Sequence, residues 1–256
     1  MANSKQSSRR DFIKQTALLG TAVVTIPSAL NALPVNAGGG ENYTFLFQGD
    51  SITDGNRSRN LDWNHVLGHG YAYLIAARLW YQFPEKKFHF FNRGISGNTV
   101  PDLAARWDDD TIAIKPNLVS ILVGVNDILR AVNGNKNFTV KTYEDDYRAL
   151  LTKTKAQLPG VQLVICEPFI LPVGPVKERW ADYLREATAR QQVAKLLATE
   201  FNAIYVPLQE RFNNAATKYP PAEYWMWDGI HPMPNGHELF AREWIRQVGK
   251  HLKFIR

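Results

Sequence analysis

The sequence predicts an α/β fold in which helices cover both faces of a parallel sheet. Five apolar segments bounded by turn residues have the length of strands, and segments with helical periodicity lie between them. The strand candidates are apolar at nearly every position instead of alternating, which is typical of parallel strands buried on both faces. Strands that alternate with helices form βαβ units, so we expect one parallel five-stranded sheet.

The predicted strands are short apolar runs that each end in a turn. In chain order they are Tyr43–Phe47, Lys87–Asn92, Leu118–Gly124, Val161–Cys166 and Ala203–Pro207. Their length and their flanking turn residues favour strands over buried helices.

The predicted helices fall between these strands and after the last one. They are Tyr71–Trp80, Tyr143–Gln157, Lys177–Phe201 and Asn235–Val248. The last segment places its large apolar residues at a 3.6-residue spacing, which is typical of a helix that packs one face on a sheet. No repeat, low-complexity tract or linker interrupts residues 38–256, so we predict that they form one domain.

Residues 1–37 are predicted to be an export signal outside the fold. The basic segment Ser8–Lys14 contains paired arginines and resembles the twin-arginine signal. An apolar stretch, Ala17–Leu30, and a small-residue cleavage site, Val35–Ala37, follow it. The apolar stretch is shorter than the roughly 18 residues of a membrane span. We therefore expect twin-arginine export, no stable membrane insertion after signal removal, and a periplasmic or secreted protein.

The composition is that of an ordinary globular protein, with 45% hydrophobic and 21% charged residues among 256. Half of the net charge of +6 lies in residues 1–37, and no dense run of Lys and Arg with aromatics follows. Nucleic-acid binding is therefore not indicated. The one cysteine, Cys166, lies in an apolar strand and is predicted to be a small buried residue, not a catalytic thiol.

Polar residues that suit acyl transfer follow the predicted strands. Ser51 comes after the first strand, and Asp228 and His231 lie before the last helix. Because reactive groups of an α/β fold gather at the carboxyl ends of its strands, we expect these side chains to meet. Ser51 would attack, His231 would take its proton, and Asp228 would hold the imidazole tautomer.

The same edge of the sheet offers donors for an oxyanion. The candidates are the backbone N–H of Gly94 after the second strand, the amide of Asn126 after the third, and the N–H of Ser51. Asp50 is predicted to hold the turn with its carboxylate, and Asp127 to cap the helix that follows it.

These segments resemble the four sequence blocks of the SGNH, or GDSL, hydrolase superfamily. Gly49-Asp50-Ser51-Ile52 resembles the first block, with Ile in place of Leu. Asn92–Gly97, Gly124–Asp127 and Asp228–His231 are similar to the second block, the G-x-N-D block and the D-x-x-H block, in the same order. The resemblance implies a flavodoxin-like three-layer α/β/α fold, a Ser-His-Asp triad and ester hydrolysis through an acyl-enzyme.

Other kinds of site fit the sequence less well. The glycine-containing turn at Gly49–Gly55 lacks the lysine of a phosphate loop. His65 and His69 have the spacing of a helical zinc pair, but glycines beside them disfavour a helix. The acidic run 108–110 lacks the spacing of a calcium loop. We therefore expect neither a metal nor a cofactor.

The substrate is predicted less sharply. Arg57, Trp63 and His65 lie in the polar connection after the nucleophile turn, and Trp225 and Trp227 precede Asp228. Aromatic faces with polar partners suit a sugar ring, although the same aromatics also suit a core. We expect a small-molecule or oligosaccharide ester, with removal of acetyl groups from carbohydrate first. A lysophospholipase or acyl thioesterase, and a non-catalytic carbohydrate-binding protein on the same fold, stay open.

Overall fold

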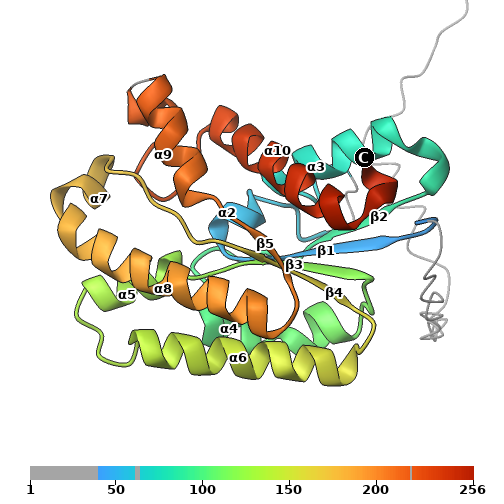
Figure 1. The fold of residues 1–256 in the computed structure, drawn as a ribbon, viewed down its shortest axis with the longest axis horizontal. Coiled ribbons are helices and arrows are strands. Elements are labelled where there is room, and N and C mark those ends of the chain that lie inside the picture. The colour runs from blue at the N-terminus through green and yellow to red at the C-terminus, as the bar shows by residue number, and fades with distance from the viewer. Residues whose placement is uncertain (1–39, 61–63, 220) are drawn as a thin grey trace, which may run out of the picture. The chain divides into compact units, whose positions relative to one another are not determined.

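A parallel sheet with the strand order β2-β1-β3-β4-β5 forms the centre of the fold (Figure 1). The structure is a computed structural model that describes residues 40–60, 64–219 and 221–256. The strands are β1 (Thr44–Gly49), β2 (His89–Asn92), β3 (Leu118–Leu122), β4 (Gln162–Cys166) and β5 (Ile204–Val206). All neighbouring strands run parallel, which confirms the predicted sheet.

The helices lie between the strands and after the last one. They are α2 (Ser51–Asp54), α3 (Tyr71–Gln82), α4 (Val100–Ala105), α5 (Val125–Val132), α6 (Val140–Gln157), α7 (Gly174–Glu178), α8 (Trp180–Glu200), α9 (Gln209–Lys218) and α10 (Pro234–His251). The predicted helix Lys177–Phe201 is instead divided at Arg179, whose backbone leaves the helical region. The helices α2, α4 and α9 were not predicted, and α5 was expected only as a helix after Asp127 without bounds.

The two faces of the sheet carry separate apolar cores. Along β1, Phe45 and Phe47 point to the face covered by α3 and α10, and Leu46 points to the face covered by α4, α6 and α8 (Figure 1). The strands β3 and β4 divide their side chains in the same way. This alternation with both faces buried explains the continuous apolar runs, and it confirms the three-layer α/β/α architecture.

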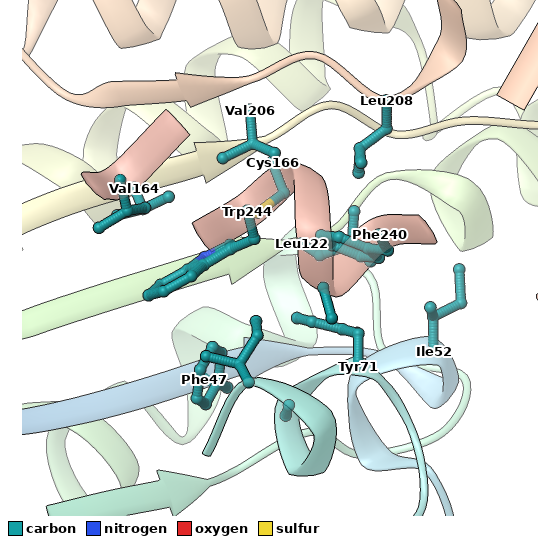
Figure 2. Packing of buried hydrophobic residues seen from close by; sticks show 14 of the residues in the cluster. Phe47, Ile52, Tyr71, Leu122, Val164, Cys166, Val206, Leu208, Phe240 and Trp244 are labelled. Atoms are coloured by element: carbon teal, nitrogen blue, oxygen red, sulfur yellow. The ribbon is translucent and has the colours of Figure 1, made fainter. Parts of the chain in front are cut away.

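Trp244 of α10 is the central contact on the first face (Figure 2). Its ring lies 5.6 Å from that of Phe47, centroid to centroid, and its indole Nε1 donates to Ser120 Oγ at 2.9 Å. Ser120 Oγ also lies 3.6 Å from Cys166 Sγ. Burial raises the pKa of the Cys166 thiol to about 12, so this cysteine is a packed core residue, as predicted.

The strand order places a topological switch point between β1 and β3. The chain passes from β1 to β2 on one side and then to β3 on the other, so the connections leave in opposite directions. Such a switch point is where open α/β sheets of this order bind ligands. The register pairs Gly49 with Leu122, so the residues that follow β1 and β3 begin side by side.

Replacing Trp244 by alanine is expected to destabilise the protein by about 3–5 kcal/mol, because it opens a cavity and removes the donor to Ser120. Urea denaturation measures this change through its midpoint and slope. Tyr81→Ala is the matched control, because Tyr81 is 89% exposed. A loss below about 1 kcal/mol in Trp244→Ala would show that α10 is not held by this residue.

Candidate active site

The turn after β1 is shaped by close packing and by one carboxylate. A Cβ on Gly49 would lie 2.3 Å from Leu122 O, so only glycine fits beside β3. Asp50 is the N-cap of α2 and accepts from Ile52 N at 3.0 Å, which confirms its predicted structural role. Ser51 is the first residue of α2, so its N–H belongs to the first turn, where no intrahelical acceptor exists.

The structure brings the three predicted catalytic side chains into one hydrogen-bonded series. Ser51 Oγ lies 2.7 Å from His231 Nε2, and His231 Nδ1 lies 2.6 Å from Asp228 Oδ2. The other oxygen of Asp228 accepts from the backbone N–H groups of Ile230 and His231 at 2.9 and 2.7 Å. Asp228 therefore holds both the ring and the backbone of His231.

The loop that carries Asp228 and His231 is fixed at both ends. A short antiparallel bridge joins Met226 to Pro232, and Trp227 N donates to His231 O at 3.2 Å. Gly229 has φ +91°, and a Cβ there would lie 2.6 Å from Val173 O, so the loop requires glycine. The base and its carboxylate are thus placed as one rigid unit.

Electrostatics favour a charged His231 beside Asp228. The hydrogen bond and charge of Asp228 raise the pKa of His231, and partial burial opposes this. Burial alone would raise the pKa of Asp228, but hydrogen bonds from the ring and backbone of His231 and from Ile230 N lower it overall. The raised pKa of His231 and the lowered pKa of Asp228 both favour an ion pair between them. Asp228 therefore stabilises the imidazolium that forms when His231 takes a proton.

The predicted oxyanion donor Gly94 is occupied elsewhere. Its N–H donates to Asn92 Oδ1 at 2.9 Å, and a Cβ on Gly94 would lie 2.3 Å from Asp54 N. Gly94 is therefore a close-packing residue against α2, and its N–H is not free for an oxyanion. The sequence prediction for this residue was wrong, because it could not show where the amide points.

The loop of residues 93–99, between β2 and α4, has one backbone N–H without an acceptor among the described residues. Most of its N–H groups donate within the protein, namely those of Arg93, Gly94, Ile95, Ser96, Asn98 and Thr99. Among the described residues no acceptor faces the N–H of Gly97, which is exposed, has φ +83° and has no atom within 4 Å of an added Cβ. The sequence signal that could have identified Gly97 is a glycine between Ser96 and Asn98, a pattern typical of a turn with a left-handed backbone conformation.

Asn126 keeps part of its donor capacity. Its Nδ2 donates to Asn98 O at 3.0 Å, which joins α5 to the loop that carries Gly97. An amide nitrogen carries two hydrogens, so one remains for a ligand. Asn126 is half-buried at the start of α5, directly after β3.

Asp54 connects α2 to the same loop. Its buried carboxylate accepts from Arg57 N, from two nitrogens of Arg59 and from the N–H and Oγ of Ser96, at 2.5 to 3.3 Å. Burial would raise the pKa of Asp54, but these donors and the charge of Arg59 lower it overall. Asp54 therefore stays ionised and fixes the residue before Gly97.

Two further carboxyls are buried beside the series. Burial raises the pKa of Asp50 to about 7 and that of Asp127 to about 6. Asp127 was predicted to cap the helix that follows it, and this was wrong. It lies inside α5 and accepts from Val100 N at 3.3 Å, so it caps α4 across a tertiary contact.

The predicted substrate contacts lie in different surroundings. Trp227 is 62% exposed and its ring stacks on that of His231, with centroids 5.7 Å apart. Trp225 is half-buried against the core, and its Nε1 donates to Tyr219 O at 3.1 Å. His65 is exposed in the connection after α2, Arg57 lies close to Gly94, and Trp63 lies outside the described residues.

The described part of the chain shows neither a metal-binding group nor a membrane-spanning helix. No group of three or more His, Cys, Asp or Glu residues there is placed to hold a metal ion. No helix in residues 40–60, 64–219 and 221–256 is long and apolar enough to cross a bilayer.

Comparisons with known proteins assign the chain to one family. The model of the GDSL-like lipase/acylhydrolase family matches residues 47–239. The chain belongs to this family. It is therefore a carboxylic ester hydrolase, as the four sequence blocks implied.

Relatives of the GDSL-like chain span most of its length. An acetylxylan esterase of Geobacillus stearothermophilus is 36% identical over 220 residues, which cover 82% of this chain and 95% of that protein. A GDSL-like lipase structure from Parabacteroides merdae matches with TM-score 0.78 and 40% identity, covering 82% and 96%. Axe2, an acetylxylan esterase from Geobacillus stearothermophilus, matches with TM-score 0.72 and 35% identity, covering 82% and 96%.

Structures of catalytic mutants of Axe2 replace a serine, an aspartate or a histidine by alanine. Its aspartate precedes its histidine by three residues. Asp228 and His231 have the same spacing here.

Asp228→Asn is expected to lower the pKa of His231, since the carboxylate raises it. In the unaltered enzyme kcat/KM should fall in acid from a pH above the ordinary histidine pKa of about 6.5, as His231 becomes protonated. In Asp228→Asn the acid limb of the profile of kcat/KM against pH should move to lower pH. The maximal kcat/KM should fall by a factor on the order of 10⁴.

Profiles of kcat/KM against pH with p-nitrophenyl acetate and an NMR titration of the His231 ring test this. Asp182→Asn is the matched control, because Asp182 is an exposed aspartate on α8. An acid limb that stays in place in Asp228→Asn would contradict the role of Asp228.

Proposed function

We propose that the chain removes acetyl groups from carbohydrate through an acyl-enzyme on Ser51. The observation that carries this proposal is the hydrogen-bonded series Ser51–His231–Asp228 at the switch point between β1 and β3. A serine hydroxyl becomes a nucleophile when an adjacent base takes its proton, and His231 Nε2 is within hydrogen-bond reach of Ser51 Oγ.

The reaction has two halves. Ser51 Oγ attacks the ester carbonyl while His231 Nε2 accepts its proton, and Asp228 stabilises the imidazolium. His231 then protonates the leaving alcohol, which departs from the tetrahedral intermediate and leaves an acetyl group on Ser51. A water molecule attacks this ester with His231 again as base, and acetate leaves as Ser51 regains its proton.

The tetrahedral oxyanion binds three donors. They are the N–H of Ser51, the uncommitted N–H of Gly97 and the second hydrogen of the Asn126 amide. The Asn126–Asn98 hydrogen bond and the Asp54–Ser96 hydrogen bonds hold Gly97 from both sides. Donors fixed before the reaction stabilise developing charge without a cost in reorganisation.

Carbohydrate is the substrate class that the surroundings of the site favour. Trp227 presents an exposed aromatic face beside His231, which suits the C–H face of a sugar. The Geobacillus relative, which covers 82% of this chain, is named for its action on acetylated xylan. No comparable observation favours a lysophospholipase, an acyl thioesterase or a binding protein without catalysis.

The chain is organised for export in this proposal. Residues 1–37 form a twin-arginine signal and residues 38–256 the hydrolase domain, with the mature protein in the periplasm or outside the cell. The support is the order of a paired-arginine segment, an apolar stretch and small residues in the sequence. Because twin-arginine substrates cross the membrane folded, the single domain would already hold its active site during export.

Ser51→Ala is expected to abolish hydrolysis of p-nitrophenyl acetate and acetate release from acetylated xylooligosaccharides, with the thermal transition unchanged. The intact enzyme should prefer acetyl over longer acyl esters. Ser58→Ala, which removes another serine hydroxyl after the same turn, serves as the matched control. Activity in Ser51→Ala close to that of the intact enzyme would end the acyl-enzyme mechanism, and a preference for long acyl chains would instead support the lysophospholipase alternative.

Asn126→Ala is expected to lower kcat by roughly 10²–10³, with a much smaller change in KM, because the lost donor acts mainly on the transition state. Asn135→Ala removes an exposed amide beyond α5 and provides the comparison. Steady-state kinetics on p-nitrophenyl acetate measure both. If kcat is the same in Asn126→Ala and in the control, Asn126 is not an oxyanion donor.

A further inference from the structure

Arg57 is held in one orientation beside the candidate active site. Its backbone N donates to Asp54 Oδ1 at 3.1 Å, and its side-chain Nε donates to Gly94 O at 3.0 Å. The side chain is half-buried. The backbone N–H and the side-chain Nε of Arg57 are therefore anchored, and its two terminal nitrogens bind no acceptor among the described residues.

The neighbouring acids are already paired with other arginines. Asp54 binds Arg59 through both oxygens, at 3.0 and 2.5 Å. Asp110 pairs with Arg106 at 2.8 Å and lies 3.5 Å from Arg93.

No carboxylate of the described residues lies within ion-pair distance of Arg57, and its terminal nitrogens donate to none of their acceptors. Among the described residues, Asp54 and Asp110 thus pair with Arg59, Arg93 and Arg106, and Arg57 has no carboxylate partner.

This imbalance has a physical cost that a bound anion would remove. Burial lowers the pKa of Arg57 to about 10, and the positive charges of Arg59 and Arg93 act in the same direction, against Asp54 and Asp110. The guanidinium still carries its charge at neutral pH. A half-buried cation without a counter-ion is destabilised, so an anionic group that reached it would be favoured.

The position of Arg57 connects it to the reaction. The backbone N–H of Arg57 donates to Asp54, the last residue of the short helix α2 that Ser51 begins, so one four-residue helix links Arg57 to the nucleophile. Gly94, whose carbonyl orients Arg57, opens the loop that presents Gly97. A group bound at Arg57 would belong to the same substrate molecule whose ester is at Ser51.

We propose that Arg57 forms a subsite for a sugar carboxylate, so that the preferred substrates are acetylated glycans that contain uronic acid. This rests on the proposed deacetylation of carbohydrate. The planar guanidinium binds a carboxylate with two parallel N–H···O bonds, and Arg57 has two terminal nitrogens available. The carboxylate belongs to a uronic acid side group on a neutral backbone or to a backbone of uronic acids, and both present the same chemistry.

The test compares acetylated substrates that carry a sugar carboxylate with a substrate that carries none. The full chain is assayed for acetate release from acetylated xylooligosaccharides with and without a glucuronic acid side group, and from acetylated oligogalacturonides. We expect kcat/KM to be ten- to a hundredfold higher for the acidic xylooligosaccharide, which matches two hydrogen bonds to a charged group. Added salt should reduce this ratio. The oligogalacturonide shows whether a backbone carboxylate serves equally.

Variants locate the preference at Arg57. Arg57→Gln should bring the ratio of kcat/KM on the acidic xylooligosaccharide to kcat/KM on the neutral one close to one. Arg57→Lys should give an intermediate ratio, because lysine keeps the charge but cannot form the two parallel hydrogen bonds of a guanidinium. The ratio cancels any general effect of the lost Gly94 contact on catalysis. Arg185→Gln, which removes an exposed arginine on α8, should keep the ratio of the intact enzyme.

The outcomes separate the subsite from the proposed function. Equal kcat/KM on acidic and neutral xylooligosaccharides by the intact enzyme overturns the subsite and leaves deacetylation standing. An acidic preference that persists in Arg57→Gln places the carboxylate elsewhere and also overturns it. Hydrolysis of p-nitrophenyl acetate without acetate release from any glycan overturns the proposed function, and the subsite with it. If Arg57→Gln fails to fold, Arg57→Lys and the salt dependence of the intact enzyme decide.

Discussion

The carboxylate of Asp54 is the interaction on which the geometry of the active site depends most. It is buried at the end of the helix that begins with Ser51, and it accepts five hydrogen bonds from three other residues. A buried carboxylate without such donors would be costly, so these bonds both keep it ionised and fix the segments that supply them. The side chain of Asp54 thus links the helix of the nucleophile, the Arg57 segment and the Gly97 loop.

The rest of the site is attached to this unit through the sheet. Parallel pairing sets β1 beside β3, which places the start of α5, and therefore Asn126, next to the nucleophile turn. The loop with Asp228 and His231 arrives from the start of α10, and α10 is anchored by Trp244 against β1 and β3. The packing that stabilises the fold is therefore also what sets the distance between Ser51 and His231.

Sequence reasoning predicted the sheet, the long helices and the three residues of the hydrogen-bonded series, because these have local signals. Continuous apolar runs indicate buried parallel strands, and Ser51, Asp228 and His231 lie in recognisable short motifs. Gly94 was chosen wrongly as an oxyanion donor, since which amide of a loop is free depends on tertiary acceptors such as Asn92 Oδ1. The role of Asp127 was missed for the same reason, because its partner Val100 comes from another element. The short helices are stabilised by packing and capping more than by their own periodicity, so the sequence pattern alone did not reveal them.

The hydrogen bond between Ser51 and His231 joins residues that are 180 positions apart in the chain. Closing a loop of this length costs conformational entropy before the contact stabilises the fold, so non-local contacts of this kind slow folding. The base lies in the last tenth of the sequence, so a growing chain cannot possess the complete site until synthesis is almost finished. Esterase activity in this molecule is therefore a report on the folding of the whole domain, and no fragment that lacks α10 and the loop before it could keep it.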